Sequence, residues 1–170
     1  FYVSVGSSSM TSDSSQSANI DHTTGHFAGV RGNQIFFQEW APKDPPRGVI
    51  LIVHGYAEHS GRYAALATDL VNAGFAVGAL DHRGHGQSEG KRVQVDSFDD
   101  LVDDLSTYEG QLRGRYPAPL PLFILGHSMG GLISLRYVTR DGSEATGIVL
   151  SGAAADKPDD ISGLTITIGN

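Results

Sequence analysis

The sequence lacks several features that would place it in a familiar class of protein. It contains no cysteine, which excludes disulfides, thiolate catalysis and cysteine-based zinc sites. No apolar run approaches the roughly 20 residues of a membrane-spanning helix. The N-terminus has no basic region followed by an apolar one, so we expect no secretory signal. The first residue is not methionine. Met10 would be a natural start, and we expect residues 1–9 to contribute nothing to the fold.

Positive charge is also scarce. Lysine and arginine number 12 against 19 aspartates and glutamates, which gives a formal net charge of -7. This balance argues against a uniform basic face for nucleic acid, and acidity by itself names no other partner. The 170 residues, 39% hydrophobic and 18% charged, predict a globular chain of one domain with a real core.

Serine dominates the beginning of the chain. Residues 4–17 contain eight serines and little else that could pack. We therefore expect a disordered tail over residues 1–25 and the start of order near His26.

Apolar stretches alternate with helical patterns along the rest of the chain. Residues 26–30 and 34–40 flank Arg31-Gly32-Asn33, where a turn would form a β-hairpin. The later predicted elements are strands at 49–53, 75–80, 122–125 and 148–150 and helices at 62–72, 98–112 and 129–139. This alternation predicts an α/β protein with a doubly wound, mostly parallel sheet.

Side-chain spacing predicts which faces of two helices are buried. In helix 62–72, Tyr63, Leu66 and Leu70 share one face, and Gly74 is expected to end the helix. Ser97 is expected to cap helix 98–112. The apolar face of that helix should consist of Phe98, Leu101, Val102, Leu105 and Leu112.

Four aspartates lie near the start of helix 98–112. The simplest interpretation is a solvated face whose first members pair with the positive end of the helix dipole. Calcium binding is the alternative, but the EF-hand spacing and its glycine are absent. The four residues are Asp99, Asp100, Asp103 and Asp104.

The segment Gly126-His127-Ser128-Met129-Gly130 fits the pattern G-x-S-x-G. The pattern alone is weak, and an ordinary glycine-rich turn would also match it. Here a buried strand ends just before it and a helix begins just after Ser128. Such a turn lifts the serine hydroxyl above the sheet and directs the helix N-terminus at the reaction centre. We therefore predict Ser128 to be a nucleophile, supported by Gly126, His127 and Gly130.

Two more polar segments follow predicted strands. His54-Gly55-Tyr56 follows strand 49–53, either as a plain turn or as a source of a backbone N–H for an oxyanion, with Gly55 allowing close approach. The segment from Asp81 to Gly86 contains two histidines and could suggest a metal site. The simpler interpretation is a tight loop whose polar side chains satisfy the backbone and shape the pocket floor.

Three ordered segments together resemble the signatures of the monoacylglycerol lipase and lysophospholipase-like hydrolases, of the serine aminopeptidase S33 type. They are His54-Gly55-x-x-Glu58-His59-Ser60-Gly61-Arg62-Tyr63, Asp81-His82-Arg83-Gly84-His85-Gly86-x-Ser88-x-Gly90 and Gly126-His127-Ser128-Met129-Gly130-Gly131. The resemblance covers approximately residues 26–160. It implies an α/β-hydrolase fold and hydrolysis of small lipid esters without a cofactor or metal. By matched position, Ser128 is the nucleophile and Tyr56 and Met129 supply the oxyanion-hole amides.

The resemblance fails at the catalytic base. In this fold the triad runs serine, acid, histidine along the chain, but no histidine follows Ser128. Asp156, Asp159 and Asp160 follow it too early to be assigned as the acid. We expect residues 26–156 to be the N-terminal part of a hydrolase core and residues 157–170 the start of an incomplete cap. The seven histidines are His22, His26, His54, His59, His82, His85 and His127.

Two classes of function stay open. The chain is the front part of a lipid-ester hydrolase, or it is a truncated product without catalysis. Among enzymes, a carboxylesterase of the same fold is the nearest rival, whereas Ser128 disfavours dehalogenases and epoxide hydrolases with an aspartate nucleophile. The resemblance favours a cytoplasmic location, with membrane contact through the cap. We expect the chain alone to be nearly inactive, because a serine is a weak nucleophile without a base.

Overall fold

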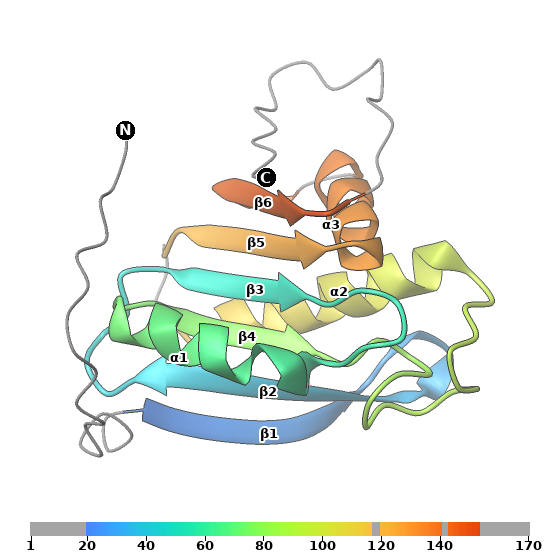
Figure 1. The fold of residues 1–170 in the computed structure, drawn as a ribbon, viewed down its shortest axis with the longest axis horizontal. Coiled ribbons are helices and arrows are strands. Elements are labelled where there is room, and N and C mark those ends of the chain that lie inside the picture. The colour runs from blue at the N-terminus through green and yellow to red at the C-terminus, as the bar shows by residue number, and fades with distance from the viewer. Residues whose placement is uncertain (1–19, 117–119, 141–142, 154–170) are drawn as a thin grey trace.

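One sheet organises the molecule. The computed structural model describes residues 20–116, 120–140 and 143–153, and within them the strand order is β1-β2-β4-β3-β5-β6 (Figure 1). The strands are β1 (Ile20–Ala28), β2 (Gln34–Pro42), β3 (Val49–Val53), β4 (Ala76–Leu80), β5 (Leu122–His127) and β6 (Gly147–Ser151). The helices are α1 (Ala64–Asn72), α2 (Phe98–Arg113) and α3 (Met129–Thr139), with 3₁₀ turns η2 (Val30–Gly32) and η3 (Ser60–Tyr63).

The parallel part of the sheet is centred on β3. β4 pairs with one side of β3 and β5 with the other, and β6 extends the parallel ladder beyond β5. The hairpin of β1 and β2 is antiparallel and joins the sheet through β4. The predicted α/β class, hairpin and mostly parallel sheet are therefore confirmed. The carboxyl ends of β3, β4 and β5 point to the same edge, and the loops that follow them gather there (Figure 1).

Helices cover both faces of the sheet (Figure 1). On one face, Ala67 and Val71 of α1 pack in a cluster with Ile50 and Ile52 of β3. On the other face, α2 and α3 pack against Leu51 and its neighbours; the main contributors from the two helices are Leu101, Val102, Leu105, Tyr108, Leu112, Ile133 and Tyr137. This arrangement is the doubly wound architecture predicted from the alternation of elements.

The start of order is earlier than predicted. β1 begins at Ile20, not near His26, and pairs with β2 along its whole length. Residues 20–25 gave no apolar signal because they form a polar edge strand, held by the backbone ladder and by His22 stacked on Trp40 at 5.0 Å. The rest of the predicted tail, residues 1–19, and the predicted cap, residues 157–170, lie outside the described residues.

The predicted face of α1 is wrong at one position. Tyr63 and Leu70 pack against the core beside the buried Ala67 and Val71, whereas Leu66 is 36% exposed. The helix itself begins at Ala64, because Ser60–Tyr63 form the 3₁₀ turn η3, and its buried positions follow Ala67 and Val71. The predicted stop is confirmed, because α1 ends before Gly74, whose φ is +88°.

The start of α2 also differs from the prediction. Ser97 occupies the N-cap position, but its side chain makes no capping hydrogen bond. Phe98 is 37% exposed and does not belong to the buried face, whereas the other four predicted apolar residues are buried. No helix within the described residues is long and apolar enough to cross a membrane.

Candidate active site

Ser128 lies at the corner between β5 and α3. Its backbone has φ +51° and ψ -118°, a left-handed conformation that costs a non-glycine residue about 1–3 kcal/mol. Its amide donates to the carbonyl of Ser151 at 2.9 Å, and its carbonyl accepts from the amide of Gly131 at 2.9 Å, which starts the helix. The structure therefore has the sharp strand-to-helix turn that the sequence predicted around Ser128.

The two glycines flanking this turn have no room for a side chain. A Cβ atom at Gly130 would lie 2.0 Å from the carbonyl oxygen of Val53, and one at Gly126 would lie 2.6 Å from Oγ of Ser134. The close approach of Gly130 to Val53 means that the start of α3 packs directly against the end of β3. The two glycines therefore bring Ser128 beside the loop that follows β3.

The loop after β3 approaches the serine through Gly55. A Cβ at Gly55 would lie 3.2 Å from Cβ of Ser128 and 3.2 Å from the carbonyl oxygen of His127. Beyond it, the Tyr56 side chain is 57% exposed and its hydroxyl donates to the carbonyl of Val93 at 3.0 Å. Within the described residues, the amides of Tyr56 and Met129 donate to no protein acceptor. The geometry of the described residues therefore leaves both predicted oxyanion-hole donors without an acceptor of their own, which is consistent with the prediction but does not test it.

His54 is buried, and both of its ring nitrogens form hydrogen bonds with backbone groups. Its Nδ1 donates to the carbonyl of Gly55 at 2.7 Å, and its Nε2 accepts from the amide of His82 at 2.9 Å. Burial lowers the pKa of His54 to about 4, although Asp81 and Glu58 raise it in part. The ring is therefore neutral near pH 7 and has no free lone pair.

Two more histidines pack on His54. His82 donates from Nε2 to the carbonyl of His54 at 3.1 Å, and His85 donates from Nδ1 to the carbonyl of Arg83 at 3.0 Å. Burial, and then the neighbouring histidines, hold the pKa of His82 well below its ordinary value. In the part of the chain that the structure describes, no three histidines, aspartates or glutamates are grouped to hold a metal ion.

The remaining site histidines do not reach the serine hydroxyl either. His127 has Nδ1 3.4 Å from Oγ of Ser151, toward β6, and His59 is an exposed residue of the loop after β3. Among residues 20–116, 120–140 and 143–153, no histidine forms a hydrogen bond with Ser128.

The loop after β4 is tied to the loop after β3 by a buried carboxylate. Asp81 accepts hydrogen bonds from the amide and hydroxyl of Ser60, at 2.7 and 2.6 Å, and from the amide of Gln87 at 2.8 Å. The hydroxyl of Ser88 donates to the carbonyl of Asp81 at 2.5 Å. Polar side chains of this segment thus satisfy backbone groups, as its interpretation as a tight loop predicted.

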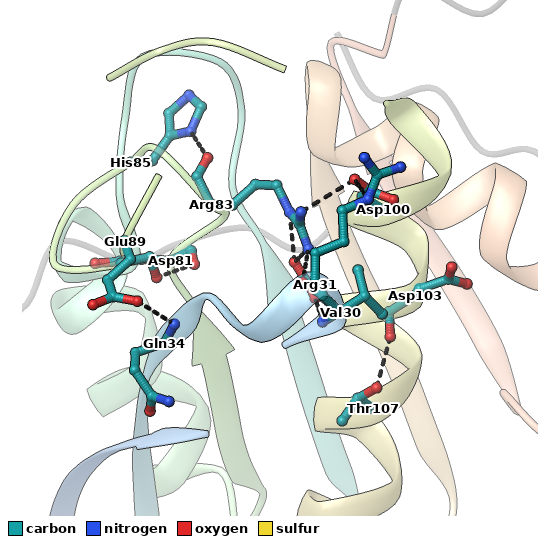
Figure 2. Close-up of polar contacts among 12 residues, drawn as sticks. Val30, Arg31, Gln34, Asp81, Arg83, His85, Glu89, Asp100, Asp103 and Thr107 are labelled. Atoms are coloured by element: carbon teal, nitrogen blue, oxygen red, sulfur yellow. Dashed lines mark hydrogen bonds and ion pairs between the residues drawn. The ribbon is translucent and has the colours of Figure 1, made fainter. Parts of the chain in front are cut away.

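The predicted solvated face of α2 is only half correct. Asp100 and Asp104 are buried, at 7% and 0% exposed, and both bind Arg83 (Figure 2). Asp99 and Asp103 lie on the outer side and pair with arginines of the α3 region. The error arose because the partner of Asp104 lies 21 residues earlier in the chain, where helical spacing gives no information. One feature of the sequence could have indicated that Asp104 is buried: it directly precedes Leu105, which was predicted to lie on the apolar face of the helix.

Comparison with known proteins gives a consistent result. The family model "Serine aminopeptidase, S33" matches residues 44–168. The chain is 44% identical over 142 residues to a monoacylglycerol lipase of Mycolicibacterium smegmatis, covering 84% of this chain and 50% of the relative. It is 40% identical over 125 residues to the monoglyceride lipase of Homo sapiens, covering 74% of this chain and 41% of the relative.

A solved carboxyl esterase from Bacillus coagulans, in complex with glycerol, matches with a TM-score of 0.71 and 31% identity, over 77% of this chain and 44% of the esterase. The chain thus spans half or less of the length of these relatives. The match to the family model covers β3 to β6, the turn at Ser128 and the loop after β3. The chain belongs to the serine aminopeptidase S33 family, among the α/β-hydrolases of the monoacylglycerol lipase and lysophospholipase type.

Proposed function

We propose that the protein is a carboxylic ester hydrolase of the monoacylglycerol lipase kind, with Ser128 as its nucleophile. The observation that carries this proposal is the strained backbone of Ser128 at the strand-to-helix corner. Strain of this kind persists only where the surrounding fold enforces it, and it is concentrated at functional sites. The relatives named as monoacylglycerol lipases support a small lipid ester as the substrate.

The amides of Tyr56 and Met129 form the oxyanion hole in this proposal. When the serine oxygen bonds to the ester carbonyl carbon, the carbonyl oxygen becomes an anion that needs donors already in place. The Met129 amide opens α3, so the helix dipole also favours negative charge there. The attack requires a base to remove the proton of the hydroxyl, and the leaving alcohol takes that proton. The backbone geometry of the site supports this assignment, and no metal or cofactor is invoked.

The base and the acid of the triad are proposed to come from outside these 170 residues. The nearby histidine rings support this view, because both nitrogens of His54 are occupied and His127 lies toward Ser151. We accordingly propose that this chain alone is nearly inactive. Purified residues 10–170 should hydrolyse p-nitrophenyl butyrate no faster than the Ser128→Ala variant. Turnover near that of an intact lipase, abolished by the substitution, would refute the proposal.

The nucleophile is tested by fluorophosphonate labelling of the protein expressed from its complete reading frame. Labelling should disappear in Ser128→Ala. Ser134→Ala is the matched control, because Ser134 is a buried serine of α3 whose hydroxyl donates to the carbonyl of Gly130 at 2.7 Å. Equal labelling of the wild type and Ser128→Ala would overturn the assignment.

A carboxylesterase of the same fold is the second candidate, and the solved carboxyl esterase at 31% identity favours keeping it. Turnover of monoacylglycerols, short p-nitrophenyl esters and peptide amides separates the two. The lipase proposal expects monoacylglycerols to be preferred. Preference for short esters would favour the esterase, and preference for amides would contradict both.

A further inference from the structure

A carboxylate lies inside the loop that approaches Ser128. The side chain of Glu58 is only 9% exposed, and its Oε1 accepts the amide N–H of Gly55 at 2.5 Å and the hydroxyl of Tyr63 at 2.8 Å. Its Oε2 lies 3.6 Å from the guanidinium of Arg62. Hydrogen bonds to an ionised acceptor are roughly twice as strong as neutral ones. Glu58 therefore links the backbone just after β3 to the turn η3 by hydrogen bonds.

Gly55 is the link between this carboxylate and the nucleophile. A Cβ built at Gly55 would lie 2.9 Å from Oε1 of Glu58 and 3.2 Å from Cβ of Ser128. The backbone at Gly55 is thus held between the two side chains. The bond from its amide to Glu58 closes the four residues 55–58 into a tight turn, and the Tyr56 amide lies within that turn.

The turn is strained at its second half. Ala57 has φ +57°, a left-handed conformation that an alanine adopts only when other contacts enforce it. The Gly55 amide bond to Glu58 spans Ala57 and is the contact in place to enforce it. The peptide that carries the Tyr56 amide is also held through its carbonyl, because the Gly55 oxygen accepts from Nδ1 of His54 at 2.7 Å. The bond to Glu58 fixes the preceding peptide, and the two bonds together set the orientation of the backbone at Gly55.

Electrostatics keep the carboxylate ionised. Burial alone would raise the pKa of Glu58, but the hydrogen bonds from the Gly55 amide and the Tyr63 hydroxyl, together with His127 and His54, outweigh it and lower the pKa. The pKa of Tyr63 is raised, by burial and by Glu58, so its hydroxyl keeps its proton and remains a donor. The two side chains thus stabilise each other in the states that the contacts require.

We propose that Glu58, together with Tyr63, is a positioning residue that fixes the Tyr56 amide for the oxyanion, an inference that rests on the proposed hydrolase function. The carboxylate acts through the Gly55 backbone, without forming a bond to the substrate. Loss of an oxyanion donor costs about 10²–10³ in rate, and misplacing a group by about 1 Å can cost about 10². Loss of the Glu58 contacts should therefore lower kcat while leaving KM nearly unchanged.

The kinetic test uses the protein expressed from its complete reading frame, with Glu58→Leu, Glu58→Gln and Tyr63→Phe. We expect Glu58→Leu to lower kcat about 10- to 100-fold, below the loss of a whole donor. Glu58→Gln should recover part of that loss, because its amide oxygen still accepts from Gly55. Tyr63→Phe should show a smaller fall, since it removes one hydroxyl. It also keeps the test decisive if Glu58→Leu does not fold.

Glu89→Gln is the matched control for stability. Glu89 accepts the backbone amide of Gln34 at 2.8 Å (Figure 2), so it makes the same kind of contact away from Ser128. Because this contact is exposed, its variant should lower the melting temperature by no more than Glu58→Gln does, and it should leave kcat unchanged. If both glutamine variants lower kcat equally, or if Glu58→Leu and Tyr63→Phe keep kcat within twofold, the positioning role is wrong.

The amide resonance of Gly55 reports the contact independently of activity. In ¹⁵N spectra of the same variants, the Gly55 proton should move upfield and exchange faster in Glu58→Leu, and it should stay in place in Glu89→Gln. An unchanged Gly55 resonance would overturn the proposal even in an inactive protein. Ser128→Ala separates the two ideas. Turnover that survives it refutes the hydrolase proposal, whereas turnover that it abolishes, with wild-type kcat in Glu58→Leu, refutes only the role of Glu58.

Discussion

Arg83→Met should destabilise the fold more than any surface charge substitution in the chain. Arg83 donates to Asp104 at 2.9 and 2.7 Å and to Asp100 at 3.1 Å, and it also donates to the carbonyl of Val30 at 3.0 Å. Figure 2 shows Arg83 and Arg31 converging on the start of α2. The cluster thereby connects the hairpin turn, the loop after β4 and α2.

The magnitude follows from what the substitution leaves behind. The side chain of Asp104 is 1% exposed and that of Asp100 is 10% exposed. Methionine would leave the buried carboxylate of Asp104 without its cation, whereas Asp100 would keep Arg31 at 3.0 Å. Removing one partner of a buried ion pair costs about 3–5 kcal/mol. At about 2–4 °C per kcal/mol for a chain of this size, the melting temperature should fall by about 6–20 °C. The matched pair Arg136 with Asp99 has side chains 53% and 57% exposed. Arg136→Met should therefore cost less than about 1 kcal/mol.

Urea unfolding followed by tryptophan fluorescence measures both variants. Trp40 is the only tryptophan and is 5% exposed, so its emission reports the core. Adding Asp104→Asn to Arg83→Met should restore much of the stability, because asparagine is neutral and can still accept the Val30 amide, which now donates to Asp104 at 2.8 Å. The destabilisation should also shrink in acid, where protonation neutralises the stranded carboxylate. If Arg83→Met costs no more than Arg136→Met, the cluster does not hold the fold in the way described.

Three further predictions concern the site. The pKa of His54, lowered to about 4 mainly by burial against 6.5 for the free side chain, gives stability that is full above pH 6.5 and is lost as the pH falls to about 4; urea unfolding across this window should lose up to about 3 kcal/mol in the wild type and less in His54→Asn. Gly130→Ala should cost at least about 1–3 kcal/mol, because its Cβ meets a backbone oxygen at 2.0 Å. Gly110→Ala, which meets nothing within 4 Å in a helix, should instead stabilise by about 0.5–1 kcal/mol, and equal melting temperatures for the two would contradict the packing argument. Tyr56→Phe loses only an exposed hydrogen bond to Val93, so kcat should fall by less than about 10-fold; a loss as large as that of a missing oxyanion donor would show that the side chain itself takes part.

Local sequence patterns were sufficient to predict the elements whose own residues show a clear apolar run or helical spacing. The predicted strand 49–53 and helix 129–139 coincide with β3 and α3, because continuous apolar runs and helical spacing are decided within each segment. The first part of β1, residues 20–25, was missed, because an edge strand is stabilised by its neighbour and needs no apolar residues. In α1, Tyr63 and Leu70 were assigned correctly to the core side and Leu66 was not.

The candidate site divides in the same way. The sharp turn at Ser128 could be predicted because the strand, the turn and the helix that form it are contiguous in the sequence. The burial of Asp104 depends on Arg83, and no spacing rule connects an acidic residue of a helix to an arginine in an earlier loop. Glu58 was part of a signature segment, but its partners became evident only when the loop was closed in three dimensions.

The presence of several histidines in the loops near Ser128 does not by itself make the site able to catalyse a reaction. A general base needs a free lone pair directed at the hydroxyl and a pKa near the working pH. His54 fails on both counts, because its Nε2 accepts from the His82 amide and its pKa is lowered to about 4. Burial orients such a ring but also removes it from solvent, which lowers its pKa. The ring therefore stays neutral and is a weaker base. A buried histidine whose ring supports the loop after β3, as His54 does, is therefore poorly suited to activate the proposed nucleophile. In the proposed hydrolase, the base would therefore come from a side chain that approaches Ser128 from outside the backbone of that loop.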